Sequence, residues 1–523
     1  MEYDYIIVGS GFGGSVSALR LSEKGYKVLV VEKGKWYRAS DFAKTNRDLK
    51  RWLWIPMLRC FGIMKMSFFR HITIASGVGV GGGSLVYANT LPIPKSAFFK
   101  SGSWSELANW EEDLKPYYAI ALKMLGAAKN PTLFDSDKVL REMSQKLGKE
   151  SQFSATNVSV FFGKPNVLYP DPYFDGKGPE RKGCNYCGAC MTGCRNNSKN
   201  TLDKNYLHLA QVNGAKILSE KEVRDIKPID GKDGEEGYEV IIRDSTRIFK
   251  KKQIIRTKGI VISGGVMGTI KLLLSLKKRS LPRLSEKLGH DIRTNNETLV
   301  SVSTLNKDLN FSKGVAIGSI LHTDKNSHLE IVRYGEGSNA WKPLHVPYSA
   351  SKNPFIRYIN IGWNFIKSPR KYFKIYFKNS WAKKTVVLLF MQTLDSTIVF
   401  KRNLFGSMKS LISSGKKPTP FISESVKLTS MYENLANGKA TSFIGEALMG
   451  IPSTAHILGG AVMGKDQETG VIDKNNKVFG YKNMYVIDGS MISANPGVNP
   501  SLSITAIAER AMSKIENKKI TQP

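Results

Sequence analysis

A strand, turn, helix and strand at the N-terminus constrain the fold of this 523-residue chain more than any other feature. Residues 5–8 are typical of a fully buried strand, Gly9-Ser-Gly11-Phe-Gly-Gly14 of a tight turn, and 15–24 of a helix. A second apolar run, 27–31, ends at Glu32. This order predicts a dinucleotide-binding α/β fold, in which the glycines let the backbone approach a pyrophosphate and the acid binds a ribose. The alternative is an ordinary α/β unit with a glycine-rich turn.

A second glycine-rich segment bears on the choice between NAD and FAD, since the N-terminal pattern fits both. Five glycines between Gly77 and Gly83 offer bare backbone N–H groups that can line an extended ligand. Residues 72–94 contain no Lys, Arg, Asp or Glu, which also suits a membrane span. The glycines, with Pro92 and Pro94, argue against a stable helix. We therefore expect a loop that wraps a cofactor, namely FAD.

The C-terminal segment carries polar residues that indicate the same ligand. His456, then Asp488-Gly489, then Asn499-Pro500 follow one another between short apolar runs. A lone His or Asn is ordinarily a packing or capping residue, but this ordered set indicates that the residues share a flavin.

The chemistry of alcohol oxidation assigns roles to two of these residues. The hydroxyl must lose its proton while the carbon-bound hydrogen leaves as hydride, so a base has to lie within hydrogen-bonding reach of the hydroxyl. A neutral imidazole suits that role near neutral pH, which makes His456 the expected base. Asn499 can orient the hydroxyl or contact the flavin without changing charge. A buried structural histidine is the alternative.

Several of these motifs together resemble a known family. The N-terminal pattern, Gly79-Val-Gly-Gly-Gly-Ser84 with Asn89, the strand and turn at 260–268, and the His456/Asn499 pair follow in order along nearly the whole chain. They resemble the glucose-methanol-choline (GMC) oxidoreductase family, and specifically its bacterial cholesterol oxidase branch. The resemblance implies an α/β fold with a Rossmann-like FAD-binding domain and an interleaved substrate-binding domain built on an antiparallel sheet.

The resemblance also implies how the chain is divided. The FAD-binding domain is expected from four separate segments: 1–41, 72–93, 203–284 and 451–518. The substrate-binding domain is expected from two: 94–182 and 295–450. Residues 42–70 are expected to form a lid over the substrate entrance, and 183–202 a cysteine-rich segment.

Site residues follow from the same resemblance. The residues expected to hold the ADP half of FAD are Gly9, Gly11, Gly14 and Glu32. Those expected along its pyrophosphate and flavin side are Gly81, Gly82, Gly83, Ser84 and Asn89. Val223 would offer a backbone contact to adenine. Those expected beside the ribityl chain and the flavin are Asp488, Gly489, Asn499 and Pro500. His456 and Asn499 would face the substrate.

Glu330 is the third expected catalytic residue. Its segment, 327–334, resembles a short strand on which cholesterol oxidases carry an acid that moves a proton between steroid carbons during Δ5 to Δ4 isomerisation. A carboxylate in an apolar pocket has a raised pKa and can do such work. The alternative is an exposed Glu330 paired with Arg333.

Four of the five cysteines follow the spacing Cys184-x2-Cys187-x2-Cys190-x3-Cys194, which is typical of bacterial ferredoxins. The chain has no second run of this kind, and Arg195 rather than proline follows the last cysteine. Some related oxidoreductases have similar segments that resemble iron-sulfur sites passing electrons from the flavin to a membrane acceptor. An iron-sulfur cluster, a zinc ion, and structural thiols or disulfides all remain open.

The charge of the chain indicates an anionic partner, since 77 Lys and Arg against 44 Asp and Glu give +33. Residues 341–384 hold ten Lys or Arg and no acid, interleaved with aromatic residues, and 51–70 is a second such stretch. This mixture predicts peripheral binding to an anionic membrane surface. Nucleic acid is not expected as a partner, because no recognisable nucleic-acid module surrounds the two stretches. A solvated surface with buried aromatics is the alternative, and 386–400 is too short to span a membrane.

The function expected from the resemblance is FAD-dependent oxidation of a 3β-hydroxysteroid to the 3-ketosteroid, with or without isomerisation. Electrons would pass to oxygen or to an unknown carrier. Two alternatives are a dehydrogenase of another bulky lipid alcohol with a non-oxygen acceptor, and a non-catalytic flavoprotein tethered to membranes. The N-terminus leads straight into the first strand without an export signal, so the expected location is the cytoplasm, with peripheral association to a membrane.

Overall fold

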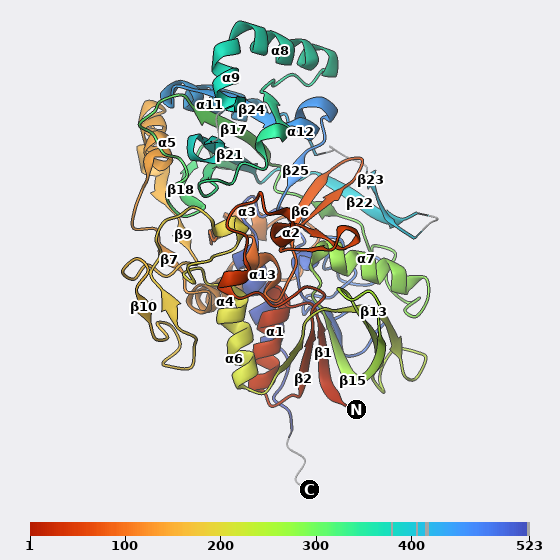
Figure 1. Ribbon diagram of the computed structural model, residues 1–523. Helices are drawn as coiled ribbons and strands as arrows, with labels where there is room; N and C mark the ends of the chain where they lie inside the picture. The colour runs from red at the N-terminus through yellow and green to blue at the C-terminus, as the bar shows by residue number, and fades with distance from the viewer. Residues whose placement is uncertain (378–379, 404–405, 414–417, 520–523) are drawn as a thin grey trace.

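The computed structural model describes residues 1–377, 380–403, 406–413 and 418–519. Two seven-stranded sheets organise this part of the chain. Figure 1 shows them in separate halves of the molecule, with the N-terminus at the first sheet.

The first sheet is mainly parallel, in the order β12-β2-β1-β15, with β26 beside β15. Its parallel strands are β1 (Tyr3–Val8), β2 (Val28–Val31), β12 (Lys216–Leu218), β15 (Lys252–Ile262) and β26 (Met484–Val486). An antiparallel pair, β13 (Lys221–Pro228) and β14 (Tyr238–Asp244), extends from β15. The apolar runs of β1 and β2 are buried along almost their whole length, as expected for parallel strands covered on both faces.

A bundle of helices packs beside this sheet. Its members are α1 (Phe12–Glu23), α4 (Trp110–Met124), α6 (Tyr206–Val212) and α13 (Ser501–Ser513). α7 (Gly265–Lys277) packs against β13. Chain segments from the N-terminal, central and C-terminal parts therefore build one Rossmann-like layer.

The turn between β1 and α1 requires glycine at two positions. Gly9 has φ +99°, and a Cβ there would lie 2.3 Å from the Ser263 carbonyl oxygen. A Cβ on Gly14 would lie 2.2 Å from the Gly9 carbonyl oxygen. Both approaches are backbone contacts that cannot yield by a side-chain rotation, so the glycine pattern reflects close packing of the turn.

The second sheet is antiparallel throughout, in the order β20-β24-β17-β21-β19-β18-β8. Its strands are β8 (Phe153–Ala155), β17 (Thr298–Thr304), β18 (Ile317–His322), β19 (Ser327–Val332), β20 (His345–Pro347), β21 (Thr385–Gln392) and β24 (Gly438–Phe443). α5 (Asp135–Lys146) and α11 (Ser423–Leu435) pack on it. The expected fold class, a Rossmann-like domain with a second half on an antiparallel sheet, is confirmed.

β21 lies in the middle of this sheet and is apolar along nearly its whole length. Val386, Leu388 and Phe390 pack with the core shared by α5 and α11. Leu389 and Met391 belong instead to a second cluster on the other face, with Val387 packed against it. Successive side chains of a strand point to opposite faces, so this one strand serves two different environments.

Smaller elements connect the two halves. Residues 42–70 contain α2 (Leu49–Trp52), β3 (Trp54–Ile55), β4 (Cys60–Phe61) and β5 (Met64–Phe68). β5 pairs with β6 (Thr73–Gly77), which in turn pairs with β25 (Ser453–Thr454). A further small sheet contains β16 (Ile292–Arg293), β22 (Thr397–Arg402) and β23 (Met408–Ile412). Across the described ranges, none of the helices has the length and apolar character needed to cross a membrane.

Candidate active site

A cavity of about 400 Å³ lies between the two halves. Its wall on the Rossmann side contains the starts of three helices: residues 11–13 at the start of α1, 263–268 at the start of α7, and 499–501 at the start of α13. Its opposite wall is formed by side chains of the antiparallel sheet: Leu299, Ser301, Ile317, Val332, Val387 and Leu389. Met64, Lys65 and Met66 of the predicted lid also line it.

Three helices begin at this cavity, and their N-termini indicate an anionic ligand. α1, α7 and α13 carry no acidic residue in the first turn. The unpaired N–H groups of a helix N-terminus and its dipole favour a negative charge. Gly11 faces open space at the first of these turns, with no atom within 4 Å of an added Cβ. The cavity thus fits a dinucleotide whose pyrophosphate lies at glycine-rich helix starts, as FAD requires.

The predicted cofactor residues divide into two groups. Those in the cavity wall are Gly11, Gly83, Asp488, Gly489, Asn499 and Pro500. Those outside the wall are Gly9, Gly14, Glu32, Gly81, Gly82, Ser84, Asn89 and Val223. Most of the second group shape the turns or lie in neighbouring strands, and their contacts with FAD stay predictions.

Glu32 and Ser84 illustrate how this second group acts. The Glu32 carboxylate accepts hydrogen bonds from the Ser10 backbone N–H at 3.1 Å, the Ser10 hydroxyl at 2.7 Å and the Gly34 N–H at 2.8 Å. Ser84 Oγ donates to the Gly81 carbonyl at 2.7 Å and accepts from the Leu202 N–H at 3.1 Å. Both side chains therefore join separate segments of the cofactor half.

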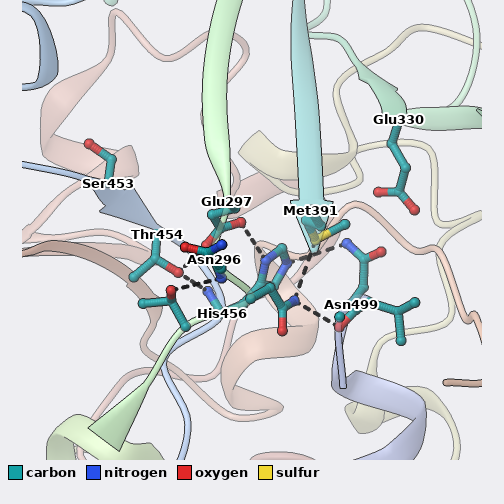
Figure 2. A network of polar contacts seen from close by, with 12 residues as sticks. Asn296, Glu297, Glu330, Met391, Ser453, Thr454, His456 and Asn499 are labelled. Carbon is teal, nitrogen blue, oxygen red and sulfur yellow. Dashed lines mark hydrogen bonds and ion pairs between the residues drawn. The ribbon is translucent and has the colours of Figure 1, made fainter. Parts of the chain in front are cut away.

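His456 lies directly after β25, in the wall of the cavity. Its Nδ1 is 2.8 Å from Glu297 Oε2, and its backbone N–H donates to Thr454 Oγ1 at 2.8 Å. The Thr454 hydroxyl in turn donates to Glu297. Figure 2 shows Glu297 and Thr454 on one side of the imidazole and Asn499 on the other. The carboxylate thus holds Nδ1 and directs Nε2 toward Asn499.

Asn499 spans the gap between His456 and Glu330, as Figure 2 shows. With Nδ2 toward Glu330, the amide donates to the two carboxylate oxygens at 2.9 and 3.1 Å, and Oδ1 lies 3.3 Å from His456 Nε2. With the amide reversed, Nδ2 lies 3.3 Å from Nε2. The first orientation suits an ionised Glu330 and a protonated Nε2, and the second a neutral Glu330 and a bare Nε2.

Burial perturbs the protonation of this chain of residues. Burial raises the pKa of Glu330 to about 8, and the nearby His456 only partly offsets it. For His456, burial alone lowers the pKa, but Glu297 and then Glu330 raise it, so that it stays above its usual value. Neighbouring buried groups with perturbed pKa values, here beside a cavity, are typical of a catalytic site.

The structure removes one alternative for Glu330. The side chain is 0% exposed, and Arg333 forms a 2.6 Å ion pair with Asp137 rather than with Glu330. An exposed Glu330 paired with Arg333 is therefore wrong. Glu330 lies on β19 on the same face as Val332, which lines the cavity, because alternate residues of a strand share a face.

Glu297 is the functional residue that sequence reasoning missed. It precedes β17 and lies 159 positions from His456 in the chain, within no recognisable motif. A histidine base is usually oriented by a third group, which predicts that an acid exists but not where it lies. Glu446, a second buried acid in the same wall, was also missed; burial raises its pKa to about 8.

The four clustered cysteines come together as the spacing predicts. They line one small cavity together with Lys199, and all five cysteines of the chain have free thiols. The disulfide alternative is thus contradicted, and structural thiols stay open. Among the residues that the structure describes, no three Cys, His, Asp or Glu side chains are arranged to hold a single metal ion, which argues against zinc.

A cofactor cavity of this kind beside a buried histidine meets the two requirements of alcohol oxidation, a hydride acceptor and a proton acceptor. The fold and the site thus define a flavin-dependent alcohol oxidoreductase. Profiles described as GMC oxidoreductase match residues 179–283 and 405–508, and one described as an NAD(P)-binding Rossmann-like domain matches 7–36. The chain belongs to the GMC oxidoreductase family, in its cholesterol oxidase branch.

Full-length relatives support this membership. A cholesterol oxidase of Acinetobacter baumannii is 44% identical, with 99% of this chain and 95% of that protein covered. A cholesterol oxidase of Mycobacterium tuberculosis (strain H37Rv) is 42% identical, with 99% and 92% covered. The crystal structure of pyridoxine 4-oxidase from Mesorbium loti has the same fold, with a TM-score of 0.61, 14% identity and 98% of each chain covered.

Proposed function

We propose that this enzyme oxidises the 3β-hydroxyl group of a cholesterol-like sterol to the ketone. The observation that carries the proposal is the position of His456 and Asn499 beneath a wall of apolar side chains in the cofactor cavity. The relatives from Acinetobacter baumannii and Mycobacterium tuberculosis are both named cholesterol oxidases, which supports a sterol substrate and oxygen as an acceptor. FAD, when bound, supplies the hydride acceptor.

The apolar wall suits a large, rigid and mostly hydrocarbon substrate. Aliphatic side chains of the antiparallel sheet continue into an aromatic group, which consists of Tyr334, Trp341, Trp381 and Phe443. Burial of apolar surface stabilises binding by about 25 cal/mol per Å², so a fused-ring alcohol gains most of its affinity here. The polar groups that meet its reacting hydroxyl are then few and fixed in place.

His456 is the proposed proton acceptor. Its Nδ1 is held by Glu297, so Nδ1 carries a proton and Nε2 is the nitrogen that faces Asn499 and the cavity. When Nε2 is bare it accepts the hydroxyl proton, and Glu297 stabilises the imidazolium that results. Glu297 therefore positions the base and raises its pKa, but does not touch the substrate.

The Asn499 amide connects the protonation of His456 to that of Glu330. A protonated Nε2 favours Oδ1 toward His456, and Nδ2 then donates to an ionised Glu330. A neutral Glu330 favours the opposite orientation, which leaves Nε2 unprotonated. The pair therefore carries one shared proton in either arrangement, with the amide turning between them.

Glu330 supports the further proposal of Δ5 to Δ4 isomerisation. Its pKa, raised to about 8 by burial, lets the carboxyl both release and take up a proton near neutral pH. It lies fully buried beyond Asn499, on the face of β19 that it shares with His328 and Val332, where a proton moved between ring carbons would stay away from water.

The test is an anaerobic titration of the purified flavoprotein with a 3β-hydroxysteroid, followed by oxygen. Bleaching of the flavin absorbance and its return with oxygen is the expected result. Bleaching that persists in oxygen would point to the alternative, a dehydrogenase with another acceptor. A flavin that bleaches only with other bulky alcohols would overturn the sterol assignment.

The same proposal includes the division into domains. The strands of the parallel sheet all fall within 1–41, 203–284 and 451–518, whereas those of the antiparallel sheet fall within 94–182 and 295–450. Met64 to Met66 line the cavity from the segment expected to be a lid. Both observations support the boundaries expected from the sequence.

Peripheral binding to an anionic membrane surface is the remaining part of the proposal. α8 (Pro354–Lys367) and α9 (Pro369–Phe377) lie at the end of the molecule opposite the Rossmann sheet in Figure 1. α8 presents an outward stripe of Phe355, Ile359, Trp363 and Ile366, with Phe355 71% and Trp363 61% exposed. Such exposure of large apolar side chains marks an interaction site.

Basic residues lie beside this stripe, and the inner face of the neighbouring helix α9 packs against residues of the substrate wall. Lys367, Arg370, Lys371 and Lys374 are exposed beside the apolar residues. Tyr372 and Ile375, on the inner face of α9, pack with Trp381, and Trp341 packs on the same cluster; both tryptophans line the cavity. A lipid surface with anionic headgroups would meet both kinds of side chain and would lie next to the sterol entrance.

Vesicle co-sedimentation tests this docking surface. Replacing Phe355 and Trp363 by serine is expected to reduce binding to phosphatidylglycerol vesicles several-fold, while oxidation of detergent-solubilised steroid stays unchanged. Val212→Ser is the control, because Val212 is similarly exposed on α6 in the Rossmann half. Equal vesicle binding by all three proteins would refute the proposed surface.

A further inference from the structure

A polar group interrupts the apolar wall of the cavity at a distance from the catalytic residues. Glu297 directly precedes β17, and the strand then brings Leu299 and Ser301 into the cavity wall, because alternate residues share a face. Ser301 lies four positions after Glu297, which corresponds to about 13 Å of extended chain at about 3.3 Å per residue. This length is comparable to that of a fused four-ring skeleton. On the proposed function, a sterol whose 3β-hydroxyl lies at His456 therefore brings its far end to Ser301.

The Ser301 hydroxyl is held in one direction by His345. His345 Nδ1 lies 2.8 Å from the Trp341 carbonyl oxygen, which can only accept, so Nδ1 carries the ring hydrogen. Burial lowers the pKa of His345 to about 4, so the ring is neutral near neutral pH and its Nε2 is bare. Ser301 Oγ, 3.0 Å from Nε2, therefore donates to it. The Ser301 oxygen keeps lone pairs that can accept, but it has no hydrogen left to give.

Two buried donors beside this pair have no partner among the residues that the structure describes. They are the Trp381 indole N–H and the Thr441 hydroxyl. Trp381 begins α10 (Trp381–Lys384), is 4% exposed and lines the cavity, with its ring centroid 5.3 Å from that of His345. Thr441 lies directly opposite Ser301 on the neighbouring strand β24, so the two share a face of the sheet. A buried donor without an acceptor is unfavourable, so an occupant that supplies an oxygen stabilises this wall.

The group fits a neutral oxygen rather than a charged one. His345 is neutral, and none of the described residues that line the cavity from the antiparallel half is Lys or Arg. A carboxylate here would be buried without a counter-charge. The Trp381 N–H can only donate, and Ser301 Oγ is left only to accept. A ketone oxygen would accept from Trp381, whereas a hydroxyl would accept from Trp381 and also donate to Ser301.

From these observations we propose that the sterol substrate carries a neutral oxygen, as a hydroxyl or a ketone, at the end opposite its 3β-hydroxyl, and that Trp381 and Ser301 recognise it. The inference rests on the proposed function and narrows its substrate class. Trp381 and Ser301 are specificity-determining residues, because they contact the far end of the substrate and take no part in the proton transfer at His456. Their hydrogen bonds hold the ring system along the apolar wall.

The test compares three 3β-hydroxysteroids that differ only on the five-membered ring. They are dehydroepiandrosterone, which has a ketone there, the corresponding β-alcohol, and the analogue without oxygen on that ring. Flavin reduction in a stopped-flow instrument gives kcat/KM for each. Both oxygenated steroids should exceed the third about ten-fold or more, because the analogue leaves the buried donor of the site unpaired.

Two variants separate the two contacts. Trp381→Phe keeps an aromatic ring but removes the N–H, so most of the preference for both oxygenated steroids should be lost. Ser301→Ala should lower kcat/KM for the alcohol about ten-fold and leave that for the ketone unchanged, because only the alcohol donates to Ser301. Trp36→Phe, at an indole that is 39% exposed and outside the cavity wall, is the control and should keep all three values. Each variant is judged by ratios between steroids, so a general loss of stability does not mimic the result.

The outcomes distinguish this inference from the proposed function. Equal kcat/KM values for the three steroids would show that the buried donors meet only water, and would overturn the inference while the proposed function stands. A preference that Trp381→Phe leaves unchanged would overturn it in the same way. A flavin that none of the three steroids reduces would overturn the proposed function as well.

Discussion

The two halves of the molecule supply opposite kinds of groups to one site. His456 and Asn499 belong to the C-terminal segment that completes the Rossmann half, whereas Glu297 and Glu330 come from the start of β17 and from β19 of the antiparallel sheet. His456 and Asn499 of the first half each contact a buried carboxylate of the second. The groups proposed to transfer protons are therefore assembled at the interface between the two halves.

The difference lies in what each half can tolerate. The cofactor wall depends on backbone geometry, because the residues packed behind it leave no room for a Cβ at Gly9 or Gly14. The antiparallel half depends on charge, because its carboxylates Glu297 and Glu330 change the protonation of His456, which the other half holds. A substitution that disturbs the cofactor wall should therefore abolish FAD binding, whereas a substitution of a carboxylate in the other half should lower activity only in part.

The largest effect is expected from the cofactor wall. Gly14→Ala places a Cβ against the Gly9 carbonyl oxygen, and neither backbone can move without opening the turn. We expect loss of FAD absorbance and a lower melting temperature. Gly362→Ala is the control, since that glycine in α8 has no atom within 4 Å of an added Cβ. A variant at position 14 with full FAD content would break the comparison.

The next effect is expected at the junction itself. His456→Gln removes the proton acceptor but keeps a polar side chain, so kcat should fall about 10²–10⁴-fold with FAD still bound. The measurement is flavin reduction in a stopped-flow instrument. His208→Gln, at a partly exposed histidine bonded to the Lys177 carbonyl, should leave the rate unchanged. A rate within a few-fold of wild type would exclude His456 as the base.

Glu297→Gln should act more weakly and change the pH profile. The base works only when Nε2 is bare, so kcat/KM rises with pH through the His456 pKa. Burial lowers that pKa, and Glu297 is the main group that raises it. Without the charge the pKa falls, and the acid limb of the profile moves to lower pH, with a maximum reduced about ten-fold.

Glu446→Gln provides the matched control for that profile. Glu446 lines the same cavity and accepts from the Ser453 N–H at 3.0 Å, but it does not contact His456. Its acid limb should stay with that of the wild type. An unmoved limb in Glu297→Gln would show that the carboxylate is merely structural.

Glu330→Gln should have the smallest effect on oxidation, and it should abolish the isomerisation proposed for this residue. Its stability effect has a defined sign. The folded-state pKa, about 8, lies above the ordinary 4.5, so the wild type loses stability as pH rises between these values. The glutamine variant has no such loss. The unfolding free energy of the variant minus that of the wild type should therefore increase by about 1 kcal/mol or more from pH 5 to pH 8. If this difference stayed constant with pH, the raised pKa of Glu330 would be contradicted.

The sequence predicts the features of the site that depend on local motifs, but not those that depend on contacts between distant segments. The turn at 9–14 and the His456 and Asn499 motifs are local, because their residue types are dictated by backbone approach or by one ligand. Glu297 had no local signal, since its partner lies 159 positions away and only the folded sheet brings them together. Burial of Glu330 likewise depends on which face of β19 meets the cavity.

The basic and aromatic stretch at 341–384 was predicted as a surface, but its exposed residues could not be chosen in advance. Tyr372 is 3% exposed, whereas the adjacent Phe373 is 60% exposed. Helical geometry turns neighbouring residues in different directions, and only packing against the cavity wall decides which of them becomes core. The sequence indicated that basic and aromatic residues are interleaved here, but only the tertiary contacts determine which aromatic residues are buried.

The alternation along β21 places the residues that line the cavity and the residues that pack in the core on opposite faces of one strand. Val387 and Leu389 shape the substrate wall, while Val386, Leu388 and Phe390 hold the core beneath α5 and α11. Substitutions at the first pair can alter which alcohol fits without disturbing the packing that keeps the domain folded. Single substitutions at Val387 or Leu389 are therefore a route to a new substrate range that leaves the core beneath α5 and α11 in place.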